Sequence, residues 1–82
     1  MDWNFRNDQP IYSQLTQRLT EAIVSGIYAP GEKLPSVREL AVEASVNPNT
    51  VQRALSELER DGLVFSQRTA GRFVTENENM IA

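Results

Sequence analysis

The spacing of apolar residues along this chain changes once, at Gly62. Before that glycine, apolar side chains recur every three or four residues in three separate segments, which places them on one face of a helix in each segment. After it, residues 63–66 and 72–75 are rich in β-branched and aromatic side chains, and the five residues between these runs include Gly71. Such a pair of runs favours a β-hairpin with the glycine near its turn. The sequence therefore predicts an α+β fold of three helices followed by a two-stranded hairpin.

The first helix is expected over residues 10–25. Pro10 suits the first helical position, where its missing N–H leaves no bond unmade, and Gly26 lies just past the end, a common place for glycine. The loop that follows contains Pro30-Gly31, a pair that suits the two central positions of a type II turn. The apolar face of the predicted helix repeats every four residues and consists of Ile11, Leu15, Leu19, Ile23 and Ile27.

Two further helices are expected over residues 36–44 and 48–61, separated by a short turn. Ser36 and Glu39 have the Ser-x-x-Glu spacing of a capping box at the start of the first of them. Asn47 is a favourable N-cap for the second. Two short helices joined by such a turn form a candidate helix-turn-helix.

Composition excludes most kinds of catalytic or metal site. The chain has 82 residues, and neither cysteine nor histidine occurs among them. Disulfides, the common zinc sites, thiol nucleophiles and Ser-His pairs are therefore excluded, and the carboxylates do not follow the pattern of a Ca²⁺ loop. We expect no metal, no cofactor and no enzymatic activity. Since no apolar run exceeds three residues and the N-terminus does not resemble a secretory signal, we also expect no membrane segment and a cytoplasmic protein.

The net charge is −3 and the sequence isoelectric point is about 4.8, which by itself argues against a nucleic-acid partner. The charge is unevenly distributed, however. Residues 33–72 contain six basic and five acidic side chains, whereas residues 1–32 and 73–82 are acidic on balance. The part of the chain with the predicted helix-turn-helix and hairpin is therefore slightly basic.

The polar face of the third predicted helix carries side chains of the kinds that read base edges. Asn and Gln can pair bidentately with adenine, and Arg with guanine. Residues 47–56 contain no acidic side chain. The alternative interpretation is a solvated polar face that is rich in amides, and the pattern alone leaves both open. On a helical wheel this face contains Asn49, Arg53, Ser56 and Arg60, with Thr50 and Gln52 on its flanks.

Basic residues near the ends of the other predicted elements are further candidates. Ser36 and Arg38 lie at the start of the second predicted helix, where a hydroxyl, a guanidinium and free backbone N–H groups can hold a phosphate. Lys33 lies just before the same place, and Arg68 and Arg72 flank the tip of the hairpin. As alternatives, Arg38 pairs with a glutamate of its own helix, and the hairpin arginines are edge-strand charges that discourage aggregation.

Four motifs occur in order along residues 10–75: PIY at 10–12, PGEKLPSVRELA at 30–41, VNPNTVQRAL at 46–55, and LERDGLV followed by GRFV at 58–64 and 71–74. In this order they resemble the winged helix-turn-helix of the GntR family of bacterial transcription factors. The forms of the first and third motifs are most similar to the YtrA-like subfamily. In that comparison the third motif corresponds to the recognition helix and the last to the strand and wing.

The resemblance implies a transcriptional regulator, usually a repressor, that binds palindromic operator DNA as a homodimer. Its family contacts DNA through the start of the second helix, the start of the third helix and the wing. The family wing usually reads Gly-x-Gly-x-Phe-Val, and Thr69 stands here in place of the first glycine. Because threonine disfavours positive φ, this departure leaves open the geometry of the wing tip and its contact with the minor groove. Carried over residue by residue, with Lys33 added for its position, the implied DNA-binding residues are Lys33, Ser36, Arg38, Asn47, Asn49, Thr50, Gln52, Arg53, Arg68 and Gly71.

Residues 10–75 are predicted to form this domain, after an N-terminal arm at 1–9 from which Trp3 or Phe5 can fold back onto the core. Residues 76–82 are predicted to begin a linker to a C-terminal region, absent from the chain, that dimerises and binds a small-molecule effector in the family. The main alternative is a winged helix that binds proteins and not DNA, which the acidic balance favours. An enzymatic function would require an aminotransferase-like domain outside this sequence.

Overall fold

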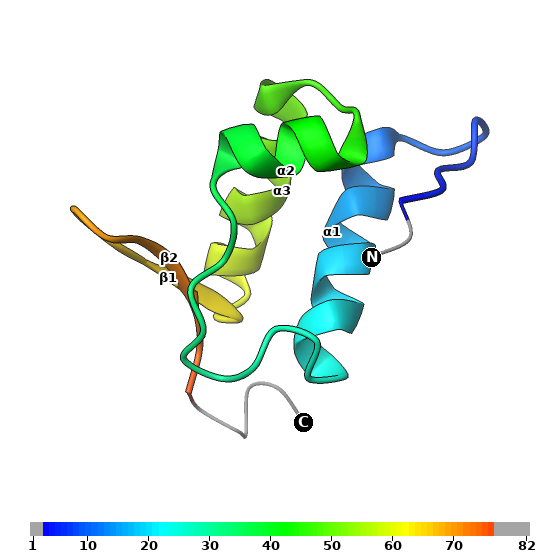
Figure 1. Ribbon diagram of the computed structural model, residues 1–82. Coiled ribbons are helices and arrows are strands. Elements are labelled where there is room, and N and C mark those ends of the chain that lie inside the picture. Colours follow the sequence, from blue (N-terminus) through cyan, green and yellow to red (C-terminus); the bar gives the residue numbers. More distant parts are fainter. Residues whose placement is uncertain (1–2, 77–82) are drawn as a thin grey trace.

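The computed structural model describes residues 3–76 and contains three helices followed by a two-stranded antiparallel sheet. In Figure 1, α3 lies between α1 and the hairpin, and α2 crosses near one end of both helices. Helix α3 contacts α1, α2 and β1, so it is the centre of the domain. The predicted α+β winged helix-turn-helix is confirmed. The elements are α1 (Ile11–Val24), α2 (Val37–Ala44), α3 (Pro48–Arg60), β1 (Val64–Gln67) and β2 (Gly71–Val74).

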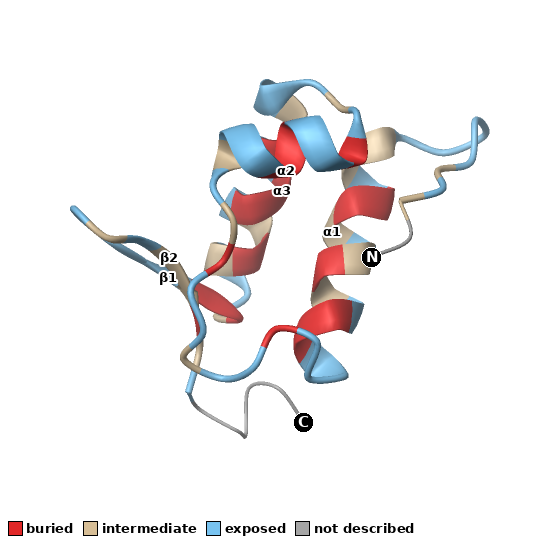
Figure 2. Cartoon of the chain, viewed as in Figure 1, coloured by how far each residue is buried: buried red, intermediate tan, exposed pale blue. Residues whose placement is uncertain are grey.

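The core is formed by the facing sides of the three helices and is closed by the base of the hairpin (Figure 2). Its largest fully buried side chains are Leu15, Leu19, Ile23, Leu40, Val51, Leu55, Leu58 and Val74. These are the predicted apolar faces, with Val74 added from the hairpin. Within residues 3–76, none of the helices has the length and apolarity needed to cross a membrane.

Two predictions for the first helix are wrong. Pro10 is the N-cap and not the first helical residue, because its ψ of 136° is extended although its ring holds φ at −58°. Ile27 is 61% exposed and does not extend the apolar face. The helix ends at Val24, and Gly26, with a φ of +88°, then turns the chain away from the helical path. Tyr28 occupies the buried position beyond this turn.

The ends of the other two helices follow the predicted capping pattern. The Ser36 hydroxyl accepts from the Glu39 N–H at 3.0 Å, and the Glu39 carboxylate accepts from the Ser36 N–H at 3.1 Å. The tight turn after α2 places Ser45 in the left-handed region, at φ 57°. Asn47 then caps α3, where its Oδ1 accepts from the Asn49 N–H at 2.8 Å. Local sequence chemistry therefore accounts for the helix-turn-helix.

The hairpin is joined by a third extended segment that the sequence pattern did not predict. Strands β1 and β2 begin or end within one residue of the predicted runs and pair Val64 with Val74 and Gln67 with Gly71. On the other edge of β2, the Leu34 N–H donates to the Arg72 carbonyl at 2.8 Å, and the Val74 N–H donates to the Glu32 carbonyl at 2.9 Å. The segment around residues 32–34 therefore holds β2 between itself and β1.

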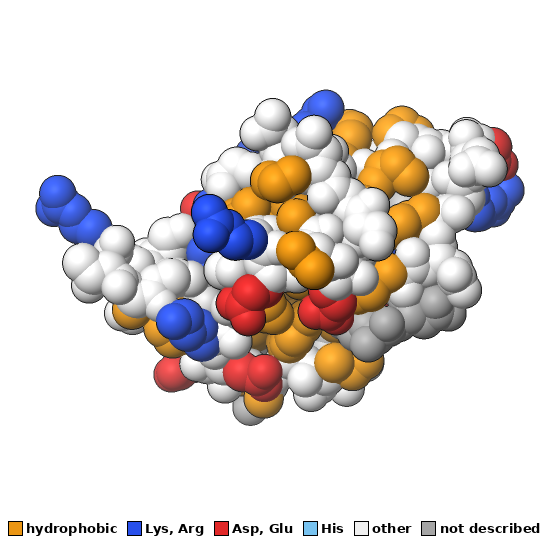
Figure 3. Space-filling view, turned by 45° about the horizontal axis from the view of Figure 1, so that its top comes forward, with side chains coloured by type: hydrophobic (Ala, Val, Ile, Leu, Met, Phe, Trp, Pro, Cys, Tyr) orange, Lys and Arg blue, Asp and Glu red, His pale blue; other side chains and the backbone are white. Residues whose placement is uncertain are grey.

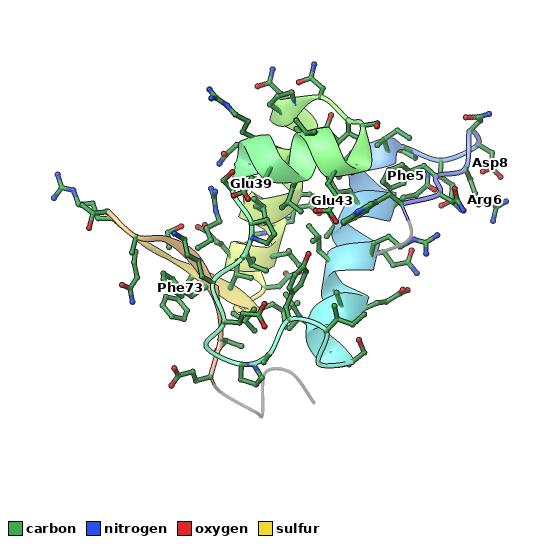
Figure 4. All side chains as sticks on the ribbon, in the orientation of Figure 1. Phe5, Arg6, Asp8, Glu39, Glu43 and Phe73 are labelled. Atoms are coloured by element: carbon green, nitrogen blue, oxygen red, sulfur yellow. The ribbon has the colours of Figure 1, made fainter. Side chains whose placement is uncertain are left out.

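The N-terminal arm is attached to α1 and α2 in the part that the structure describes. Gln14 is a buried amide of α1 that accepts from the Arg6 N–H and donates to the Arg6 carbonyl, at 2.6 and 2.8 Å. The Trp3 indole N–H donates to Glu43 of α2 at 2.9 Å. Both Trp3 and Phe5 pack against the core, as one of the sequence interpretations expected. Figure 4 shows Phe5 beside α1, whereas Arg6 and Asp8 lie at the outer end of the arm.

Candidate nucleic-acid interface

The residues predicted to contact DNA lie at the surface, on three segments. They come from the loop and first turn of α2, the N-cap and first turns of α3, and the hairpin. Thr50 is half-buried, and the other nine are exposed. Asn49, Thr50 and Arg53 line one pocket at the start of α3, and the Lys33 side chain lies over Gly71 of β2. Arg68 lies in the turn of the hairpin, which projects from the helices (Figure 1).

At the start of α3, Asn49, Thr50 and Arg53 line an open pocket of about 310 Å³ together with Ile11 and Tyr12 of α1. The Arg53 guanidinium lies over the Tyr12 ring, with its carbon 3.6 Å from the ring centre. Sequence reasoning missed Tyr12 because it lies 41 residues earlier and faces α3 only in the folded chain. Such a cation–π contact uses the face of the guanidinium and leaves its N–H groups, which lie in the plane, directed outward.

The outward amides of α3 are available for an external partner. No hydrogen bond to another of the residues 3–76 engages the side-chain amides of Asn49 or Gln52. Asn47 differs, because its side-chain oxygen is occupied as the cap of α3. The structure therefore confirms Asn47 as the predicted cap and leaves two amides, those of Asn49 and Gln52, that can pair with a base edge.

At the start of α2, the Ser36 hydroxyl is an acceptor in the capping box and also interacts with the Glu39 carboxylate. Hydrogen bonds from Ser36 lower the pKa of the Glu39 carboxyl, so Glu39 is charged and occupied at neutral pH. Glu43 accepts from the distant Trp3 indole. Arg38 pairs with neither glutamate, so the alternative interpretation of Arg38 as a surface ion pair is wrong.

The basic side chains divide into those that form an ion pair or a hydrogen bond within the domain and those that do not. Three form ion pairs: Arg6 with Asp8 at 2.6 Å, Arg60 with Glu57 at 3.8 Å, and Arg72 with Glu59 at 2.7 Å. Arg18 donates to the Asn4 carbonyl of the arm at 3.1 Å. The side chains of the other four form no ion pair or hydrogen bond within residues 3–76, and each is a predicted DNA-binding residue: Lys33, Arg38, Arg53 and Arg68.

Charge is distributed unevenly over the surface near α2. Figure 3 shows basic side chains on the projecting hairpin and beside α2, with acidic side chains nearer the middle of the same face. The acidic side chains of α2 that were considered as partners of Arg38 are already engaged, Glu39 by the capping box and Glu43 by Trp3. The unpaired basic side chains are therefore left to an external partner.

Arg72 is a link between the hairpin and α3. Glu59 Oε1 accepts hydrogen bonds from both Arg72 and the Ser66 hydroxyl. The bond from Ser66 is the main cause that lowers the pKa of Glu59, and Arg72 adds to it. Burial of the carboxylate opposes these effects only in part. Glu59 thus holds the hairpin against α3, a contact that the sequence pattern did not predict.

The tip of the wing forms without a glycine at position 69. Ser45 is the one non-glycine residue among 3–76 with a positive φ, so Thr69 adopts an ordinary conformation. The turn is closed by the Ala70 N–H, which donates to the Gln67 carbonyl at 3.2 Å. Gly71 requires the backbone freedom of a glycine, because its φ is +108° and the Lys33 side chain lies over it.

The model of the bacterial regulatory proteins of the gntR family matches residues 11–74, most of the chain. The chain belongs to the GntR family. It is 49% identical over 72 residues to the HTH-type transcriptional repressor YtrA of Bacillus subtilis, a match that covers 88% of this chain and 55% of that protein. This GntR domain therefore spans about half the length of that relative.

Solved structures of the family have the same fold. A GntR family transcriptional regulator from Listeria monocytogenes superposes with a TM-score of 0.91 at 43% identity, covering 94% of this chain and 68% of that one. AraR(DBD), solved in complex with operator ORX1, superposes with a TM-score of 0.81 at 27% identity, covering 88% of this chain and 93% of that one. A domain with this fold has therefore been solved in complex with an operator.

Proposed function

We propose that this GntR domain binds operator DNA in a sequence-specific manner and acts in a transcriptional regulator, a repressor in the simplest case. The proposal rests on the positions of the unpaired basic side chains. The four basic side chains without an ion pair or hydrogen bond among residues 3–76 lie on the three segments through which a winged helix-turn-helix contacts DNA. The basic side chains of the arm, of α1 and of the end of α3 are engaged within the domain. The net charge of −3 therefore does not describe the proposed interface.

The residues have different proposed roles. Asn49 and Gln52 contact base edges in the major groove, because their amides are exposed and unoccupied by other residues of 3–76. Arg38 and Lys33 contact phosphates that flank these bases, beside the N-terminus of α2 that Ser36 caps. Arg68, at the wing tip, reaches the adjacent groove or backbone. Gly71 acts through the shape of the wing.

The assembly and the cellular setting are also proposals. Family resemblance supports a homodimer on a palindromic operator, with half-sites about 10–10.5 base pairs apart. It also supports a small-molecule effector bound by a region beyond this domain, and a cytoplasmic, non-enzymatic protein. Residues 77–82 of the predicted linker lie outside the described residues.

The first experiment is selection of bound duplexes from a random pool, with the wild-type chain at moderate salt. An enriched palindrome or half-site is expected. The salt dependence of binding to the selected duplex then counts phosphate contacts, with a log–log slope of about −3.6 if four basic side chains take part. A shallow slope without enrichment would instead favour a protein-binding module.

Two variants separate the proposed roles. Arg38→Ala should weaken all duplexes to a similar extent and flatten the salt slope by about one unit. Gln52→Ala should weaken the selected duplex by about 1–3 kcal/mol and leave random duplexes unchanged. Arg60→Ala is the matched control, since it removes the same charge from an ion-paired position near the end of α3. Equal losses for Arg38→Ala and Arg60→Ala would contradict the proposed interface.

A further inference from the structure

The stack between Tyr12 and Arg53 joins α1 to the proposed recognition helix at the edge of the interface. The guanidinium carbon lies 3.6 Å from the centre of the ring. No hydrogen bond or ion pair joins the Arg53 side chain to another of the residues 3–76, so the aromatic ring is what orients it. Both side chains are accessible, because Arg53 is exposed and Tyr12 is half-buried.

We propose that Tyr12 is a positioning residue for DNA recognition, which holds the Arg53 guanidinium in place to contact a backbone phosphate. This inference rests on the proposed function and adds to it a residue of α1, outside the helix-turn-helix and the wing. Tyr12 acts through Arg53 and does not need to touch DNA itself.

The physical reason lies in the geometry of a guanidinium. Its positive charge is attracted to the face of an aromatic ring, while its N–H donors lie in the plane and match two oxygens of a phosphate. A free arginine side chain loses much of its rotational freedom when it binds, and that loss weakens binding. Stacking on Tyr12 removes part of this freedom before DNA arrives, so more of the contact energy appears as affinity.

The surroundings of the stack favour a phosphate over a base as the partner. Arg53 leans toward α1, whereas Gln52 lies on the other flank of α3. The pocket beside the guanidinium is also lined by Thr50, whose hydroxyl is a further hydrogen-bond donor. An open hollow that offers a guanidinium and a hydroxyl as donors suits one phosphate group at the edge of the groove.

A double-mutant cycle tests the proposal on the selected duplex and on a random duplex. Tyr12→Leu should weaken binding to both duplexes by about three- to tenfold, because it removes the stack. Leucine keeps an apolar side chain at this position. Arg53→Ala should weaken both by about tenfold and flatten the salt slope by about one unit. The double variant should bind like Arg53→Ala alone, within about twofold. Tyr12→Phe is the matched control, which keeps the ring and should bind like the wild type.

Nuclear magnetic resonance supplies a readout that a merely structural role of Tyr12 would not move. Protons of the Arg53 side chain lie over the ring and should be shifted upfield in the wild type and in Tyr12→Phe, and not in Tyr12→Leu. Thermal unfolding of each variant checks that the domain remains folded at the temperature of the binding assay.

The outcomes separate the positioning role of Tyr12 from DNA binding as such. If the wild type binds no duplex, the proposed function fails. If the wild type binds and Tyr12→Leu weakens binding as much in the Arg53→Ala background as in the wild type, the positioning role is overturned. An effect of Arg53→Ala confined to one base pair of the selected duplex would overturn the phosphate assignment.

Discussion

Replacing Gly71 by alanine tests how the wing is built. Gly71 opens β2 with φ at +108°, where an L side chain is strained whatever the space around it. A Cβ built on Gly71 would also lie 3.1 Å from Lys33 Cε, closer than an ordinary contact. That second conflict is small, because the neighbour is the far end of a flexible side chain. The backbone conformation is therefore expected to dominate the effect.

The magnitude follows from two opposing effects. A non-glycine residue in a sparsely populated positive-φ conformation costs about 1–3 kcal/mol. The lower entropy of the unfolded alanine variant offsets about 0.4–1 kcal/mol. We expect a net destabilisation of about 1–2 kcal/mol, against a total stability of roughly 4–12 kcal/mol for a domain of this size. That corresponds to a fall in melting temperature of roughly 5–15 °C.

Thermal unfolding followed by circular dichroism measures this loss. Gly26→Ala is the matched control, because Gly26 has φ at +88° and nothing lies within 4 Å of the added Cβ. The two variants should lose similar stability, but only Gly71→Ala should weaken duplex binding, since it displaces Lys33 and the wing. A wild-type melting temperature for Gly71→Ala would show that position 71 is not strained by a side chain. Equal losses of affinity in both variants would show that the wing geometry is not the cause.

Three further predictions concern contacts away from the wing glycine. Ser36→Ala should lower the free energy of unfolding by about 1 kcal/mol in chemical denaturation, because it removes one half of the capping box, and Ser36→Asp should restore it. Glu59 has a pKa lowered below its ordinary value of 4.5, so its carboxylate stabilises the fold above that pH, and the contribution is lost as the pH falls through the lowered pKa. The stability difference between the wild type and Glu59→Gln should therefore shrink below about pH 4.5, and a difference that does not change with pH would contradict the role of the carboxylate. Trp3→Ala should destabilise the domain by about 1–2 kcal/mol, because burial of the ring is lost. Trp3→Phe should recover most of this stability. Equal losses of stability in Trp3→Ala and Trp3→Phe would show that the indole bond to Glu43 contributes more than burial of the ring.

The helix-turn-helix is the part of the fold that sequence reasoning predicted best. Ser36, Glu39 and Asn47 act on backbone groups two or three residues away, so their spacing is enough to place the ends of α2 and α3. The first helix was less well predicted. Its four-residue repeat continues to Ile27 in the sequence, but the chain has already turned at Gly26. A periodic pattern does not show where a helix ends when an apolar residue follows the turn.

The sequence predicted which residues belong to the candidate interface, but not which of their side chains are already paired within the domain. Arg53 and Arg72 look alike in the sequence, yet one lies on an aromatic ring of α1 and the other is bonded to Glu59. This distinction depends on which neighbour the fold supplies, and a side chain that is already paired is not available to DNA.

By itself, the sequence determined the order of the elements, the capped ends of α2 and α3, the apolar faces of the helices, and the family to which the chain belongs. These depend on interactions within one or two helical turns, or on motifs read in order. The tertiary structure alone decided that residues 32–34 pair with β2, that Trp3 is bonded to Glu43, and that Tyr12 lies under Arg53. Such contacts join residues about 40 positions apart in the chain, and they exist only after the core has brought α1, α2, α3 and the hairpin together.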